Sequence, residues 1–128
     1  MTEAALNELT EKIIGAAIAV HRELGPGLLE SAYERCLAYE LHERALGFEI
    51  QKPLPLVYKG VHLDCGFRMD VVVENAVVVE IKSIDRITRV HVAQMLSYLK
   101  LSGHRVGLLI NFNVPRLLDG VRRLVNQL

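Results

Sequence analysis

The segment FRMDVVVENAVVVEIKS, residues 67–83, decides how the chain folds. It contains two runs of three valines separated by the residues Glu74 to Ala76. β-Branched runs favour strands and a Glu-Asn pair favours a turn, so the segment predicts a β-hairpin. Its strands are apolar at nearly every position, which is typical of central strands buried on both faces. A three-residue loop would place Asp70 directly opposite Glu80.

Asp70, Glu80 and Lys82 are charged residues that interrupt these apolar strands. Directly opposed residues have Cβ atoms about 4.5–5.5 Å apart and side chains alternate between faces, so all three are expected on one face. Two carboxylates this close repel each other and lose hydration unless a cation joins them. Oxygen ligands favour Mg²⁺ or Mn²⁺ over zinc. Lys82 could then hold or help deprotonate a water molecule for attack on phosphorus.

The alternative for these charges is a hairpin whose acids are solvated and pair with the lysine. The flanking apolar runs would instead bury the acids, and burial of a charge without a partner is costly. We favour the metal site because unpaired charges are rare in strands buried on both faces.

The chain has 128 residues, of which 51% are hydrophobic and 23% charged, and this predicts one domain, residues 1–128. Cys36 and Cys65 show no metal-ligand spacing and are expected as buried free thiols in a helix and a strand. The first residues lack a basic segment, and the longest apolar run, Ile13 to Val20, is too short to span a bilayer. We therefore expect a cytoplasmic protein without a membrane partner.

The net charge is zero, but the charges are unevenly distributed along the chain. Residues 1–81 hold 7 Lys or Arg and 13 Asp or Glu, whereas residues 82–128 hold 8 and 2. If the basic residues lie near the acidic hairpin, they could contact a polyanion at the metal site. The alternative is that some of them pair with the N-terminal acids and the rest are solvated.

Two helices are predicted before the strands. The first is capped by Thr2, and the second runs from about Leu29 to Ala45 with Gly47 as a left-handed stop. Glu30 stands in the first turn of the second helix, where it either favours the helix dipole or points into the site as a metal ligand. Tyr33 either forms a hydrogen bond within the site or packs in the core.

The segment after the second helix is expected to be extended and interrupted. Pro53 and Pro55 exclude a central strand from Phe48 to Cys65, which leaves an edge strand or a loop. A turn at Tyr58 to Val61 is expected to lead into a strand that starts at His62 and continues through Gly66 to Val73.

The remainder of the chain predicts a helix, a strand and a helix. The first of these helices is capped by Thr88 and ends at Gly103, and Gln94 and Tyr98, four residues apart, lie on one side of it. An apolar strand spans Val106 to Phe112, and a final amphipathic helix begins near Pro115. The predicted order is ααβββαβα, an α/β fold (α+β, mixed sheet) with helices flanking a central sheet.

Three motifs carry a resemblance to known nucleases. Asp70 followed by Glu80-Ile81-Lys82 on adjacent strands resembles the PD-(D/E)XK nuclease superfamily. Gln94-Met-Leu-Ser-Tyr98 is similar to the Gln-x-x-x-Tyr motif of its RecB-type members. Gly27-Leu-Leu-Glu30-Ser-Ala-Tyr33 matches the signature of the GxxExxY family of small bacterial and archaeal proteins.

The resemblance implies a restriction-endonuclease-like core and a role for each motif residue. Asp70 and Glu80 would bind Mg²⁺ or Mn²⁺ through their carboxylates and Ile81 through its carbonyl oxygen, while Glu30 would complete or orient the metal shell. Lys82 would activate water. Gln94 and Tyr98 would steady the substrate or the lysine.

The implied activity is Mg²⁺-dependent hydrolysis of DNA phosphodiester bonds, with nucleic acid as the partner and no further cofactor. An alternative from another class is a non-catalytic module that binds nucleic acid or protein and retains the fold, because fold alone does not fix function. A homodimer or an accessory protein partner stays open, since a single active site cuts one strand.

Overall fold

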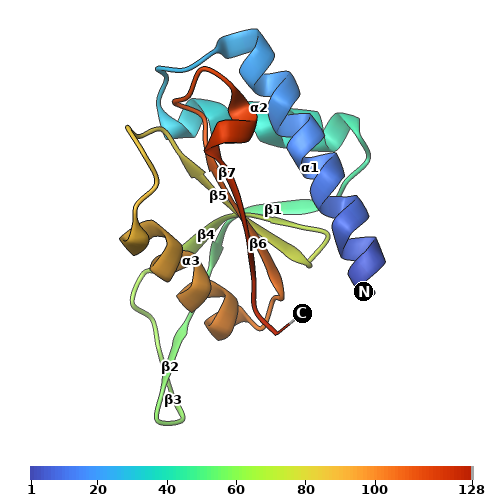
Figure 1. The fold of residues 1–128 in the computed structure, drawn as a ribbon. Helices are drawn as coiled ribbons and strands as arrows, with labels where there is room; N and C mark the ends of the chain where they lie inside the picture. The colour runs from blue at the N-terminus through green and yellow to red at the C-terminus, as the bar shows by residue number, and fades with distance from the viewer. Residues whose placement is uncertain (128) are drawn as a thin grey trace.

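The computed structural model describes residues 1–127, which form a sheet with helices on both faces (Figure 1). The helices are α1 (Glu3–Leu24), α2 (Glu30–Glu43) and α3 (Arg89–Ser102). The five-stranded sheet has the order β1 (Phe48–Pro53), β4 (Arg68–Val73), β5 (Val77–Lys82), β6 (Val106–Asn111) and β7 (Val121–Val125). A separate hairpin consists of β2 (Leu56–Tyr58) and β3 (Val61–Leu63), and a short 3₁₀ helix, η1, spans Leu117–Gly120. In residues 1–127 no helix is long and apolar enough to cross a membrane.

The sheet is mixed, as predicted. Strands β5 and β6 are parallel and α3 forms the crossover between them, whereas the pairs β1–β4, β4–β5 and β6–β7 are antiparallel. The central strands β5 and β6 are buried along almost their whole length, because helices cover both faces of the sheet. The mixed α/β architecture with flanking helices is therefore confirmed.

Two hydrophobic cores hold the layers together. The larger core joins α1 and α2 to one face of the sheet and includes Ile13, Leu37 and Val79. The smaller core lies under α3 and includes Val78, Met95 and Leu99. Successive residues of β5 thus pack in different cores, because successive side chains of a strand point to opposite faces of the sheet.

The predicted hairpin has the predicted register. Val71 pairs with Val79 and Val73 with Val77, which leaves the three loop residues Glu74 to Ala76. Glu74 and Asn75 adopt left-handed backbone conformations, with φ of 52° and 49°, and Ala76 N–H donates to the Val73 carbonyl at 2.9 Å. The Glu-Asn pair therefore makes the turn as expected.

The helix ends agree with the sequence except for one. The Thr2 hydroxyl accepts a hydrogen bond from Ala5 N–H at 3.0 Å, Thr88 caps α3, and Gly103 ends α3 in the left-handed conformation. The predicted left-handed stop at Gly47 is wrong, because Ala45 takes that conformation (φ 57°). Gly47 instead lies against the Glu74 side chain, and its N–H donates to Glu74 Oε2 at 3.3 Å.

The segment with the two prolines contains more strand than predicted. Strand β1 is an edge strand that ends at Pro53, as expected, and the turn after Tyr58 is present. The predicted continuous strand from His62 to Val73 is wrong. It breaks after β3, where Gly66 N–H donates to Asp64 Oδ1 at 3.0 Å. Cys65 consequently lies in an exposed loop and Cys36 is half-buried, both as free thiols, so the expectation that both are buried is also wrong.

The predicted final helix is the largest error. After the single 3₁₀ turn of η1, the chain forms β7 along the free edge of β6. Gly120 lies so close to β6 that a Cβ on it would clash with the Asn111 carbonyl oxygen. In β7, Val121 packs on the larger core and Leu124 on the smaller one, so a three-residue spacing that suits a helix also suits opposite faces of a strand. Leu128, which would have ended the predicted helix, lies outside the described residues.

Candidate active site

Strands β4 and β5 separate at Asp70 and Glu80. Their pairing ends at Val71 and Val79, and beyond that point β4 pairs with β1 while β5 pairs with β6. The two acids occupy the gap. Asp70 N–H donates to Glu80 Oε2 at 2.7 Å, and Ile81 N–H donates to Asp70 Oδ2 at 2.8 Å. We call Asp70, Glu80 and Ile81 the fork.

The Glu80 carboxyl is strongly perturbed. It is 4% exposed, and burial raises its pKa from 4.5 to about 8, with a further contribution from the charge of Asp70. The Asp70 N–H and the positive charge of Lys82 offset only part of this rise in the pKa. Without a cation, Glu80 is therefore mainly protonated near neutral pH, and a nearby cation would favour its charged form.

Lys82 and Tyr98 approach the fork from two elements. Lys82 is the last residue of β5 and is half-buried. Tyr98 of α3 is 7% exposed, and burial together with the charges of Glu80 and Asp70 raises the pKa of its phenol. Gln94 Nε2 donates to Tyr98 Oη at 3.4 Å from one turn earlier. The expectation that Gln94 and Tyr98 face the same place is confirmed.

Glu30 reaches the fork from the first turn of α2. It shares a cavity of about 150 Å³ with Asp70 and Ile81. Its Oε2 atom accepts a hydrogen bond of 3.3 Å from Ser83 N–H, just beyond β5. The structure thus brings Glu30, Asp70 and Ile81 together, with Glu80 and Lys82 adjacent in β5.

Three polar residues that line this cavity, Ser31, Glu34 and Gln51, were missed in the sequence. Gln51 Nε2 donates to Glu34 Oε1 at 2.7 Å and to Asp70 Oδ1 at 3.3 Å. Gln51 lies opposite Asp70 in the β1–β4 register and has a left-handed backbone with φ of 50°. This is an uncommon conformation for a residue other than glycine, and such residues cluster at functional sites. No sequence motif marks Gln51, because its role depends on α2 and β4 meeting β1.

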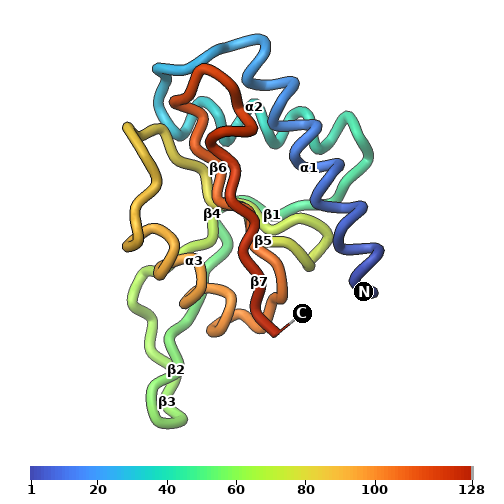
Figure 2. Tube along the Cα trace, viewed as in Figure 1, coloured from blue at the N-terminus to red at the C-terminus, as the bar shows by residue number. Residues whose placement is uncertain are grey.

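Tyr33 is a structural residue of the core. It is fully buried and its ring stacks on Phe112 with a centroid distance of 4.5 Å. Its hydroxyl donates to the Gly25 carbonyl at 2.6 Å and accepts from Leu28 N–H at 3.1 Å, which fixes the loop between α1 and α2. The Leu28 carbonyl in turn accepts from Ser83 Oγ at 2.5 Å. The Ser83 side chain thus ties this loop, which Tyr33 braces from within, to the segment just beyond β5, and the backbone of both segments can be followed in Figure 2.

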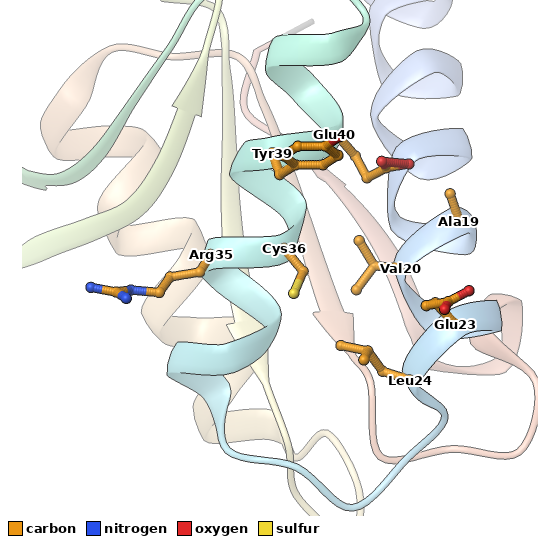
Figure 3. Close-up of a pocket in the computed structure, with 8 residues that line it drawn as sticks. All are labelled: Ala19, Val20, Glu23, Leu24, Arg35, Cys36, Tyr39 and Glu40. Carbon is orange, nitrogen blue, oxygen red and sulfur yellow. The ribbon is translucent and has the colours of Figure 1, made fainter.

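A larger cavity than the one beside the fork lies elsewhere. It measures about 520 Å³ and lies between α1 and α2, where Val20, Leu24 and Cys36 point into it and Arg35 extends away (Figure 3). None of the predicted site residues lines it. The fork, not this apolar groove, carries the groups that could perform chemistry.

The donor set at the fork fits a hard divalent cation. Within residues 1–127, no three Asp, Glu, His or Cys side chains form a ready group of metal ligands. The fork supplies two carboxylates, and Mg²⁺ is usually held through one or two carboxylates while it keeps several waters. Zinc sites are built mainly from His and Cys ligands, which the fork does not offer, so its oxygen donors suit Mg²⁺ or Mn²⁺ better.

Comparison with known proteins identifies the family. Residues 7–124 match the family described as the PD-(D/E)XK nuclease superfamily. Searches of curated proteins and of solved structures each gave no match. The family match spans nearly the whole chain and includes both strands of the fork and the helix that carries Tyr98. This chain therefore belongs to the PD-(D/E)XK nuclease superfamily.

Proposed function

We propose that this protein is a nuclease that hydrolyses DNA phosphodiester bonds with Mg²⁺ or Mn²⁺. The observation that carries the proposal is the fork, where Asp70 N–H donates to the Glu80 carboxyl, Ile81 N–H donates to the Asp70 carboxyl, and Glu80 is buried with a pKa of about 8 that the charge of Asp70 helps to raise. A buried carboxylate next to a second, half-buried one is costly to ionise unless a cation joins them. Membership of a nuclease superfamily supports phosphodiester hydrolysis as the reaction.

Each residue has a role in the proposal. Asp70 and Glu80 hold the metal through carboxylate oxygens and Ile81 through its carbonyl oxygen. The metal, when bound, polarises the phosphate and stabilises the charge that develops on it. Lys82, on the same strand as Glu80, orients a water molecule and accepts or guides its proton. Glu30 orients the metal shell from α2.

Tyr98 and Gln94 act from α3. The Tyr98 phenol is protonated near neutral pH, and burial raises its pKa further, so it can donate a hydrogen bond to a phosphate oxygen or to a carboxylate at the fork. Gln94, one turn earlier in α3, donates a hydrogen bond to this phenol oxygen. Together they steady the substrate or the lysine at the site.

The test is a cleavage assay on single- and double-stranded DNA in Mg²⁺ and in Mn²⁺. Glu80→Gln should abolish both metal binding and cleavage, because it removes one of two carboxylates. Lys82→Ala should retain metal binding and lower the rate about 10²- to 10⁴-fold, the usual loss for a group that transfers protons. Lys100→Ala removes an exposed lysine of α3 and should behave as wild type. Wild-type protein that binds neither metal and leaves all DNA intact would overturn the proposal.

The second candidate function is a module that binds nucleic acid or protein without cutting. It is favoured by the finding that, within the described residues, no three side chains form a ready metal site. In that case DNA binding should persist after Glu80→Gln and stay salt-sensitive, because phosphate contacts rather than the metal would hold the complex.

Assembly and location complete the proposal. One fork cuts one strand, so duplex cleavage would need a second copy or an accessory partner, and light scattering during turnover would reveal either. We also propose that the protein acts in the cytoplasm, as expected from the sequence.

A further inference from the structure

We propose that Arg89 and Arg122 form a cleft that binds a backbone phosphate of the nucleic acid, next to the phosphodiester held at the fork. The inference rests on the proposed function and specifies how that site binds its substrate. It concerns binding alone and adds no step to the reaction.

The cleft lies between the first half of α3 and the edge strand β7. Its volume is about 400 Å³. Arg89 lines it from the start of α3 and Arg122 from β7, while Val92, Ala93 and Leu96 of α3 supply apolar lining. The two guanidinium-bearing residues thus come from segments far apart in the sequence and meet at one opening.

The strand register places this cleft in line with the fork. Glu80 of β5 pairs with Leu109 of β6, and Leu109 pairs with Arg122 of β7. Paired residues project to the same face of a sheet, so Glu80 and Arg122 both project on the face that α3 covers. Two strand spacings separate their backbones by about 10 Å. A polynucleotide with one phosphate at the fork therefore has another within reach of Arg122.

The charge of the cleft is not neutralised by the protein. No acidic residue lines it, and the first turn of α3 contains no Asp or Glu. The ion pairs found among residues 1–127 join Lys12 to Glu8, Arg44 to Glu40 and Lys52 to Glu49, and none of them involves either arginine of the cleft. Two unneutralised guanidinium groups at one opening attract a phosphate, which arginine binds through paired N–H donors.

Arg123 provides a matched control. It is the next residue of β7 and is also exposed, but it projects to the opposite face, where its Nη2 atom donates to Asn7 Oδ1 of α1 at 2.7 Å. Loss of Arg123 removes the same charge from the same strand without affecting the cleft.

The experiment measures the affinity of labelled single- and double-stranded DNA for protein with the Glu80→Gln substitution, so that no strand is cut. Arg89→Ala and Arg122→Ala should each weaken binding roughly three- to tenfold and lower the slope of log affinity against log salt by about one. The titration covers about 50–200 mM NaCl, where counterion release dominates. Arg123→Ala should change affinity and slope much less.

Equal effects of Arg122→Ala and Arg123→Ala would overturn the inference and show that these arginines contribute only general positive charge. No effect of either substitution would also overturn it and show that the cleft does not contact DNA. Absence of DNA binding by the parent protein at low salt would overturn it as well. The proposed function is decided separately by metal binding and cleavage in the wild type. Protein that binds DNA through the cleft but cuts nothing would refute the proposed function and retain the cleft.

Discussion

At the scale of single residues, the site depends on two carboxylates that occupy positions where strand pairing stops. Asp70 and Glu80 each accept a hydrogen bond from the backbone of the opposite strand. Their opposition could be predicted from the sequence, because the loop between the valine runs fixes the register. Gln51 and Ser83 could not be predicted, since Gln51 meets Asp70 across 19 positions and Ser83 meets Glu30 across 53. Contacts of that kind exist only once the helices have packed.

The hydroxyl of Tyr33 provides a prediction about stability. Tyr33→Phe keeps the ring stacked on Phe112 but leaves the Leu28 N–H and the Gly25 carbonyl, which form partly buried hydrogen bonds, without their partner. The free energy of unfolding should fall by about 1–3 kcal/mol, measured by urea denaturation. Tyr39→Phe removes the hydroxyl of a side chain that is 64% exposed. This control should change the free energy of unfolding by less than about 0.5 kcal/mol. Equal stability of both variants would contradict a structural role for the Tyr33 hydroxyl.

Glu80 makes the stability of the metal-free protein depend on pH. Its pKa is about 8 in the folded protein and 4.5 as a free group, so the folded state binds the proton more tightly. The resulting stabilisation is complete below pH 4.5 and is lost as the pH rises through 8. The melting temperature in EDTA should therefore fall between pH 6 and 9 in wild type, and this fall should be much smaller in Glu80→Gln. Glu11→Gln, a change at an exposed position of α1, should retain the wild-type pH profile.

At the scale of elements, hydrophobic spacing predicted the three helices but not the last strand. α1 and α3 are long enough for their periodicity and caps to be unambiguous. The segment after Pro115 is shorter, and Val121 and Leu124 satisfy either a helix or a strand. A strand forms because the edge of β6 would otherwise have unpaired backbone N–H and C=O groups, and β7 pairs with them. Arg122 and Arg123 then place charges on the new edge, as edge strands commonly do.

The hairpin of β2 and β3 is a separate element that projects from the body (Figure 1). Each residue of β3 is exposed, as are Val57 and Tyr58 of β2. Replacing residues 57–62 with Asn-Gly should change the free energy of unfolding by less than about 1 kcal/mol in urea denaturation, because few contacts with the body are lost.

Leu54 at the base of this hairpin is the contrasting position. It is 4% exposed and packs in the smaller core, so Leu54→Ala should cost about 2–4 kcal/mol. A shortened hairpin as unstable as Leu54→Ala would show that the hairpin contributes to the fold.

At the scale of the whole molecule, the fork lies where the layers meet. Asp70 and Ile81 face the cavity beside α2, while Glu80 and Lys82 lie in β5 near Tyr98 of α3. The fold class could be predicted, because a hairpin followed by a helix and a further apolar strand leaves few topologies. The approach of Tyr98 to the fork was implied only by the family resemblance, and the expectation of one common face for Asp70, Glu80 and Lys82 did not anticipate that Asp70 lines the cavity beside α2 together with Ile81. The cleft at Arg122 could not be predicted, since it requires β7 where the sequence suggested a helix.

The most direct test of the central claim is calorimetric titration of Mg²⁺ or Mn²⁺ in several buffers of different ionisation enthalpy, which counts the protons released on binding. A carboxyl with a pKa of about 8 is mostly protonated at pH 7 and must lose its proton to bind a metal. We predict that metal binds to the wild type with release of a proton near pH 7, that this release declines at alkaline pH, and that no metal binds to Glu80→Gln. Absence of binding to the wild type, or binding that releases no proton and persists in Glu80→Gln, would contradict a metal site at the fork.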